Sequence, residues 1–197
     1  MLSEAAIKEA FESGDIKVVV RQILFGDDCW LFEQRGIPRI DTNYQTLKNS
    51  VSDALDINPK EVTLIGSAKI GFSMAPGKTY RPFRKGRSDL DLAIVAPSLF
   101  QTIWDALSEA SLQGYTQYRD KHAAEVFSKF IVLESEHSYK SSYLIDVARR
   151  IEEMNRAVNE NIKIRHKVNY RIYADMSSAE KYHIHGINLL RKELGCG

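Results

Sequence analysis

Residues 62–95 read VTLIGSAKIGFSMAPGKTYRPFRKGRSDLDLAIV, two apolar runs joined by a basic loop that contains glycine. The first run, at 62–65, holds β-branched residues and stops at Gly66, which predicts a short buried strand. The second run, at 89–95, starts with alternating acidic and apolar residues and ends in a continuous apolar stretch. This pattern predicts a second strand, so the mixed α/β part of the chain begins near Glu61.

The second predicted strand opens with two acidic residues, Asp89 and Asp91. Because residues two apart on a strand point the same way, both carboxylates should lie on one side, with Leu90 turned into the core. Two neighbouring carboxylates repel each other unless a cation lies between them. Hard oxygen ligands at the mouth of a sheet suit Mg²⁺ or Mn²⁺. We therefore expect Asp89 and Asp91 to be both the metal ligands and the catalytic residues.

The bend after the first predicted strand is suited to phosphate binding. Gly66 lets the backbone approach a phosphate closely, and Ser67 can add a hydroxyl and a backbone N–H, especially if a helix begins there. Lys69 and Ser88 complete the set of residues that we expect to contact a nucleotide. A metal ion beside this bend would polarise an α-phosphate and stabilise a leaving pyrophosphate.

Ile65-Gly66-Ser67 followed by Asp89-Leu90-Asp91-Leu92 resembles the signature of the polymerase-β-like nucleotidyltransferase superfamily. Residues 64–95 and the later VNYRIYAD…KYHIHGINLL segment also look like a group of small bacterial nucleotidyltransferase-like proteins, many of them linked to phage defence. The resemblance implies metal-dependent transfer of an NMP or dNMP from a nucleoside triphosphate. The acceptor would be a nucleotide, a nucleic acid or a protein side chain, and a defence operon would supply a partner protein.

The chain departs from that family in the spacer, which holds 21 residues between Ser67 and Asp89 and is longer than in most members. Two interpretations of this insertion stay open: contact with phosphates and stacking on a base, or a solvated flexible loop. Its basic and aromatic residues are Lys78, Tyr80, Arg81, Phe83, Arg84, Lys85 and Arg87.

The second departure concerns the third carboxylate, which active members carry on a later strand. The matching predicted strand, KVNYRIY at 167–173, holds Asn169 and Arg171 and no acid. Asp146 falls on the solvent side of a predicted helix, and Asp175 suits a helix N-cap. Glu134 and Glu136 would serve only if 128–134 were a strand. The alternative function is therefore a catalytically degenerate nucleotide-binding sensor or antitoxin-like regulatory subunit, and a nucleic-acid-binding module that uses the basic loop comes third.

Composition is that of an ordinary soluble globular protein: 197 residues, 44% hydrophobic and 27% charged, with a formal net charge of +1. Such a charge gives no general affinity for nucleic acid. The two cysteines, Cys29 and Cys196, lie far apart in the sequence and suit reduced thiols. The first residues are acidic where a signal peptide would be basic, and no apolar run reaches membrane length. We expect a cytoplasmic protein without a membrane segment.

The expected fold class is α/β (α+β): a nucleotidyltransferase-fold mixed sheet flanked by helices, with N-terminal and C-terminal helical segments. Residues 1–57 would form the N-terminal helical segment and 58–197 the nucleotidyltransferase domain with its C-terminal helix, together one compact unit. KVNYRIY is the further strand, and 26–41 should be irregular. Helices are expected at about 3–13, 15–24, 44–55, 97–110, 116–133, 143–162 and 177–193.

Overall fold

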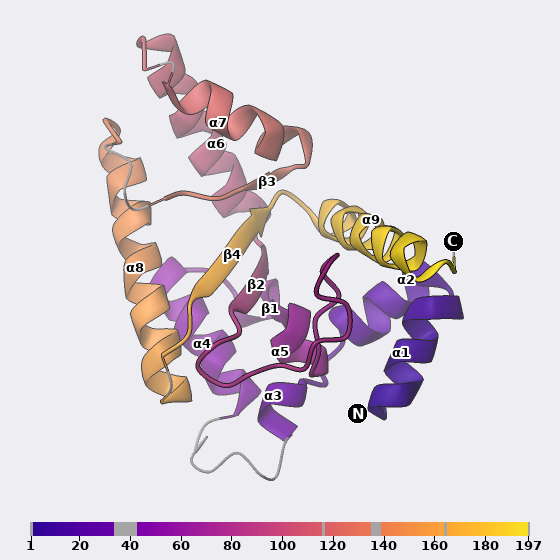
Figure 1. The fold of residues 1–197 in the computed structure, drawn as a ribbon. Helices are drawn as coiled ribbons and strands as arrows, with labels where there is room; N and C mark the ends of the chain where they lie inside the picture. The colour runs from indigo at the N-terminus through magenta and orange to yellow at the C-terminus, as the bar shows by residue number, and fades with distance from the viewer. Residues whose placement is uncertain (1, 34–42, 116, 135–138, 164, 197) are drawn as a thin grey trace.

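The computed structural model describes residues 2–33, 43–115, 117–134, 139–163 and 165–196. Within these ranges one four-stranded mixed sheet is flanked by helices (Figure 1). Its order is β1-β2-β4-β3, where β1–β2 and β3–β4 pair antiparallel and β2–β4 pair parallel. The α/β (α+β) class with a flanked mixed sheet is therefore confirmed. The strands are β1 (Val62–Ile65), β2 (Leu90–Val95), β3 (Phe130–Ile131) and β4 (Val168–Tyr173).

One face of the sheet is covered by long helices, α4 (Tyr44–Leu55), α6 (Pro97–Leu112) and α8 (Ser142–Ile162). Their apolar stripes meet the buried side chains of the strands in the largest core cluster. Removal of this apolar surface from water is the main favourable term in folding. The central members of the cluster include Leu47, Val51, Leu64, Leu92, Ile103, Leu144, Ile151, Met154 and Ile172.

The opposite face is covered by α9 (Met176–Leu194) and the short α5 (Gly66–Ile70). Here Ile65, Ala93, Tyr173 and Ala179 form a small buried cluster. Figure 1 shows α8 and α9 on the two sides of β4. The sheet is thus enclosed on both faces, and its open end lies where β2 and β4 begin.

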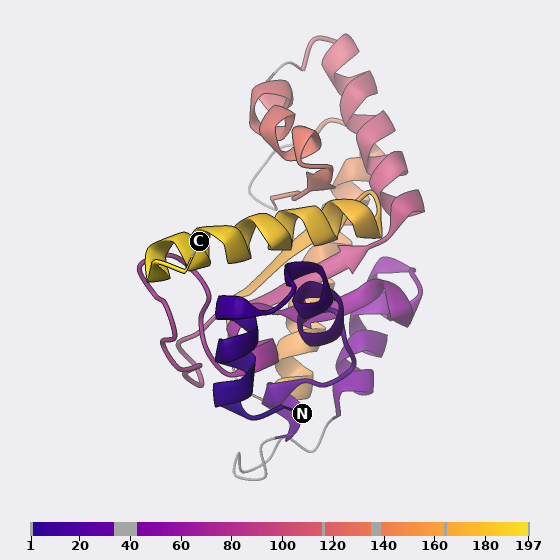
Figure 2. The ribbon, with the colours of Figure 1, turned by 90° about the vertical axis from the view of Figure 1, so that its right-hand side faces the viewer.

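The N-terminal helices pack against the C-terminal helix, and Figure 2 shows α9 lying across them. These helices are α1 (Glu4–Ser13), α2 (Ile16–Val19) and the π-helical turn η1 (Val20–Leu24). Ser3 caps α1 by accepting a hydrogen bond from the backbone N–H of Ala6. The guanidinium of Arg191 donates to the carbonyl oxygens of Phe11 and Gly14. Sequences from both ends of the chain therefore share one core cluster.

Most of the predicted helices are confirmed, but the one expected at 116–133 is too long. Helix α7 (Gln117–Phe127) stops early, Lys129 adopts a left-handed φ of 52°, and the chain enters β3. Phe130 and Ile131 then pair with Tyr173 and Ile172 of β4. Pairing with an existing strand therefore outweighs the local preference for helix.

Two shorter helices complete the described elements. Within 26–41, which was expected to be irregular, α3 (Trp30–Glu33) is helical, and 34–42 lies outside the described residues. A 3-10 turn, η2 (Pro59–Glu61), leads into β1 with Asn58 as its cap. No helix in the described ranges has both the length and the apolarity needed to cross a bilayer.

Candidate functional site

The site lies at the end of the sheet where β2 and β4 begin. Asp91 faces Ile65 of β1 on one side and Asn169 of β4 on the other. The Nδ2 atom of Asn169 donates to Asp91 Oδ1 at 3.0 Å and to Asp89 Oδ2 at 3.2 Å. The structure therefore brings the two aspartates together on one amide, with Leu90 between them fully buried in the core.

The environment of Asp91 opposes its negative charge. Burial raises the pKa of the Asp91 carboxyl above its ordinary value, and the neighbouring Asp89 carboxylate acts in the same direction. The Asn169 hydrogen bond and the positive charge of Arg171 act against this and lower it. A cation at the carboxylates would favour the ionised form further, because an opposite charge stabilises a buried carboxylate.

Gly66 lies directly against Asp91. Its φ is +66°, in the left-handed region that glycine adopts at little cost. A Cβ atom added to Gly66 would lie 2.7 Å from Asp91 Oδ2, closer than real Cβ contacts come. The bend after β1 therefore requires glycine for two reasons, and it places Ser67 at the start of α5 beside the carboxylates.

A cavity of about 550 Å³ opens on one side of the two aspartates. Two serines, Ser67 and Ser88, line it together with Asp89 and Asp91. Its remaining walls come from the long spacer and are strongly basic. A cavity with cations around a carboxylate pair suits a ligand that is itself anionic and brings a metal ion with it. The spacer residues that line it are Ser73, Ala75, Lys78, Arg81, Pro82, Arg84 and Arg87.

A second cavity, of about 820 Å³, is also lined by Asp91. Asp91 and Asn169 line it with residues from α7, α8, β4 and the segment after β3. Its lining contains acidic and basic side chains together with amides, which suits a polar ligand that has both hydrogen-bond donors and acceptors. Asp91 is shared by both cavities, so a ligand in either one would reach the same carboxylate. The polar residues of the second cavity include Glu125, Glu134, Glu152, Asn155, Lys167 and Arg171.

The long spacer is folded as a hairpin. Backbone hydrogen bonds join Ser73 with Arg81 and Tyr80 with Ser73, at 2.8 and 2.9 Å. The Tyr80 hydroxyl donates to Glu12 of α1, and the Thr79 hydroxyl donates to Glu193 of α9. Contacts with both terminal helices therefore hold the basic side chains near the carboxylates, which disfavours the interpretation as a flexible loop.

The aromatic residues of the spacer serve packing. Phe83 is buried and makes an edge contact with Trp30, with ring centroids 5.7 Å apart. Tyr80 packs edge-on against Phe72 at 5.3 Å. Neither ring lines the basic cavity, so the spacer contributes cations and serines to it but no aromatic ring.

Two of the predicted nucleotide contacts have other partners. Lys69 is only 1% exposed, its ammonium donates to the carbonyl oxygen of Gly26, and burial lowers its pKa. It lies over the ring of Tyr44 and does not line the basic cavity. Ser88 does line that cavity, but its hydroxyl accepts a hydrogen bond from the backbone N–H of Arg84 at 2.8 Å.

Two of the other acidic candidates, Asp146 and Asp175, have partners of their own on the helices that carry them. Asp146 forms an ion pair with Arg149 on the outer side of α8. Asp175 caps α9 by accepting a hydrogen bond from the backbone N–H of Ser178 at 2.7 Å. Glu134 lines the second cavity, and Glu136 lies outside the described residues. Over the ranges that the structure describes, no group of three or more His, Cys, Asp or Glu residues is placed to hold a metal ion. Asn169 occupies the position beside the aspartates.

Comparison of the chain with models of known protein families, with curated proteins and with solved structures finds no match. The geometry of the site and the resemblance of its motifs are therefore the basis for assigning a function.

Proposed function

We propose that the protein is a metal-dependent nucleotidyltransferase that moves an NMP or dNMP from a nucleoside triphosphate to an acceptor. The observation that carries this proposal is the convergence of Asp89 and Asp91 on Asn169, beside the Gly66–Ser67 bend and the basic cavity. Paired carboxylates next to a cationic cavity provide the two things that a bound triphosphate needs, metal ligands and countercharges.

The side chains at the site fit Mg²⁺ or Mn²⁺. Asp89 and Asp91 would supply carboxylate oxygens. The amide of Asn169 donates to both of them through Nδ2, so it would present its neutral oxygen to the ion only after a turn of the amide group. Such an ion characteristically takes its remaining ligands from phosphate oxygens and water. Once bound, it would polarise the α-phosphate and offset the charge that develops on the leaving pyrophosphate.

The two cavities suggest a division of the substrates. The guanidinium groups of Arg81, Arg84 and Arg87 and the ammonium of Lys78 would hold the triphosphate in the basic cavity. The larger cavity, which Asp91 also lines, would then receive the acceptor, and its mixed polar lining suits a nucleotide, a nucleic acid or a protein side chain. By resemblance, we place this activity in phage defence, with a partner protein encoded in the same operon.

A second candidate function is favoured by one specific residue. Asn169 stands where a third carboxylate would complete a two-metal site, and its amide donates to both aspartates. An amide cannot act as a general base toward an attacking hydroxyl. The same geometry therefore supports a nucleotide-binding sensor or antitoxin-like regulatory subunit that binds without turnover.

One experiment separates the two functions. The purified chain is incubated with each labelled NTP and dNTP plus Mg²⁺ or Mn²⁺, and pyrophosphate release and nucleotide binding are both measured. Release that is abolished in Asp89→Asn and in Asp91→Asn, and retained in the matched surface variant Asp146→Asn, supports the transferase. Binding without release in the wild type supports the sensor. Absence of both would refute the site, and salt-sensitive RNA or DNA binding that survives Asp89→Asn would indicate a nucleic-acid module.

A further inference from the structure

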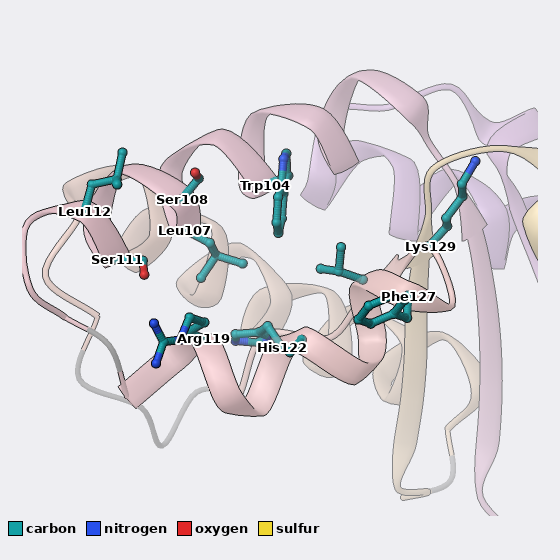
Figure 3. A pocket seen from close by; sticks show the side chains of 11 residues that line it. Trp104, Leu107, Ser108, Ser111, Leu112, Arg119, His122, Phe127 and Lys129 are labelled. Carbon is teal, nitrogen blue, oxygen red and sulfur yellow. The ribbon is translucent and has the colours of Figure 1, made fainter.

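Helices α6 and α7 extend from one end of the sheet with an apolar groove of about 570 Å³ between them (Figure 3). Each helix contributes one stripe of residues spaced by three and four positions, so each stripe is a single helix face. Neighbouring helices normally fill the space between them with interdigitating side chains. Here that space is open. The stripes are Trp104, Leu107, Ser108, Ser111 and Leu112 on α6, and Arg119, His122, Ala123, Val126 and Phe127 on α7.

The rims of the groove expose large apolar side chains. Phe127 is 92% exposed and Leu112 is 87% exposed, and Trp104 between them is 37% exposed. A small ligand confined to the groove would leave Phe127 and Leu112 in water. A macromolecule that fills the groove and extends over both rims would cover them. Contiguous exposed apolar surface of this kind is typical of protein interaction sites.

Charge indicates what kind of partner fits. Among the side chains that the structure describes, the two formally charged residues that line the groove are Arg119 and Lys129, and both are basic. Figure 3 shows them at opposite ends of the groove, Arg119 near Leu112 and Lys129 near Phe127. Lys129 also approaches Asp175, at 3.8 Å, and its side chain is 65% exposed. Complementary charges at both ends of a partner would fix its register along the groove.

The wall of the groove contains one polar atom without a hydrogen-bond partner in the described part of the chain. His122 is 3% exposed, and its Nδ1 atom lies 2.9 Å from Glu125 Oε2. Its Nε2 atom is buried and makes no hydrogen bond there. A buried polar atom left in this state costs free energy. A partner side chain would satisfy it only after a shift of the His122 ring toward the groove.

We propose that this groove binds an amphipathic helix of a partner protein, with one apolar face and acidic residues near both ends. A third helix laid between α6 and α7 would complete the packing that the two stripes begin. Helix α6 has 16 residues and is about 24 Å long, so a partner helix of about four turns matches it. The groove is separate from the carboxylate site, so this inference does not depend on the proposed activity.

The probe is a designed helical peptide of about 16 residues, with Leu and Phe on one face and Glu in its first and last turns. Fluorescence anisotropy of the labelled peptide gives the affinity, and tryptophan emission, measured in a Trp30→Phe background so that Trp104 is the emitter, reports entry into the groove. We expect Phe127→Glu to weaken binding at least about tenfold, because it places a charge on the apolar rim and repels the acidic ends. Leu189→Glu, at a 43% exposed position on α9, is the matched control and should bind within about twofold of wild type.

Each other outcome overturns the proposal. A peptide with Lys in place of Glu at its ends that binds equally well would remove the charge argument. Unchanged binding to Phe127→Glu would place the peptide elsewhere, and no binding at all would leave the groove without a helical partner. Sedimentation that shows a dimer broken by Phe127→Glu would make a second copy of this chain the occupant. Binding of a naphthalene sulfonate dye in the groove without any peptide binding would make it a small-molecule site.

Discussion

The Nδ2 atom of Asn169 lies within hydrogen-bonding distance of both carboxylates, 3.0 Å from Asp91 Oδ1 and 3.2 Å from Asp89 Oδ2. One neutral amide thus holds together two groups that would repel each other in its absence. The residue at this single position determines how many negative charges the site contains, and therefore how strongly it attracts a divalent cation.

Asn169→Asp should make the stability of the protein depend on divalent metal. In EDTA, a third carboxylate beside Asp89 and Asp91 adds like-charge repulsion, so the Tm should fall below that of wild type. With Mn²⁺ added, binding to the folded state should raise the Tm of the variant by more than that of wild type. Thermal unfolding with and without Mn²⁺ measures both effects. Asn169→Ala, which removes the amide and adds no charge, should gain no such dependence. If Mn²⁺ does not change the Tm of Asn169→Asp, the metal-site interpretation is contradicted.

Gly66→Ala should damage both stability and the site. The new methyl group would meet Asp91 Oδ2 and would hold alanine at a positive φ, which together cost about 1–3 kcal/mol. Urea unfolding gives the loss in free energy, and titration with Mn²⁺ and an NTP gives the loss in binding. Gly186→Ala is the matched control, because a Cβ at Gly186 of α9 meets open space and should stabilise the helix by about 0.5–1 kcal/mol. Equal effects from both substitutions would argue against the close approach at Gly66.

Arg87→Gln and Lys69→Met should show that the basic cavity, and not the buried lysine, contributes to NTP affinity. Arg87 lines the cavity, so its loss should weaken NTP binding by about tenfold, the worth of one charge-assisted contact. The ammonium of Lys69 is directed to the Gly26 carbonyl instead, so Lys69→Met should leave NTP affinity within about twofold once circular dichroism shows it folded. Isothermal titration with an NTP and Mg²⁺ measures both. The reverse order of effects would restore Lys69 as a phosphate contact.

The site illustrates which features a sequence can predict. The convergence of Asp89 and Asp91 follows from the two-residue period of a strand, which is a local property. Their contact with Asn169 depends on the parallel register of β2 with β4, which joins residues 78 positions apart. Because register is set by tertiary packing, a motif read locally shows that Asn169 is not acidic but not that its amide bonds to both aspartates.

The misplaced elements have a similar cause. The apolar run at 130–133 fits either a helix or a strand, and periodicity alone does not separate the two in so short a segment. Pairing with β4 decides for the strand. Lys69 lies on a five-residue helix, where sequence does not indicate which side faces the core. Its burial follows from contacts with the ring of Tyr44 and the carbonyl oxygen of Gly26, both from segments distant in the sequence.

Replacement of His183 by Phe should flatten the dependence of stability on acid pH. His183 lies on α9 among the rings of Phe25, Tyr173 and Tyr182, and burial, aided by the positive charge of Arg171, lowers its pKa from 6.5 to about 4. Below pH 6.5 the unfolded chain therefore binds a proton that the native state refuses, so stability is lost as pH falls toward 4, by about 2 kcal/mol at pH 5. Urea unfolding at pH 7.5, 6 and 5 should show this loss in wild type and in the control His185→Phe, and a smaller loss in His183→Phe. Parallel pH profiles for wild type and His183→Phe would mean that the ring is already protonated, or exposed, in the native state.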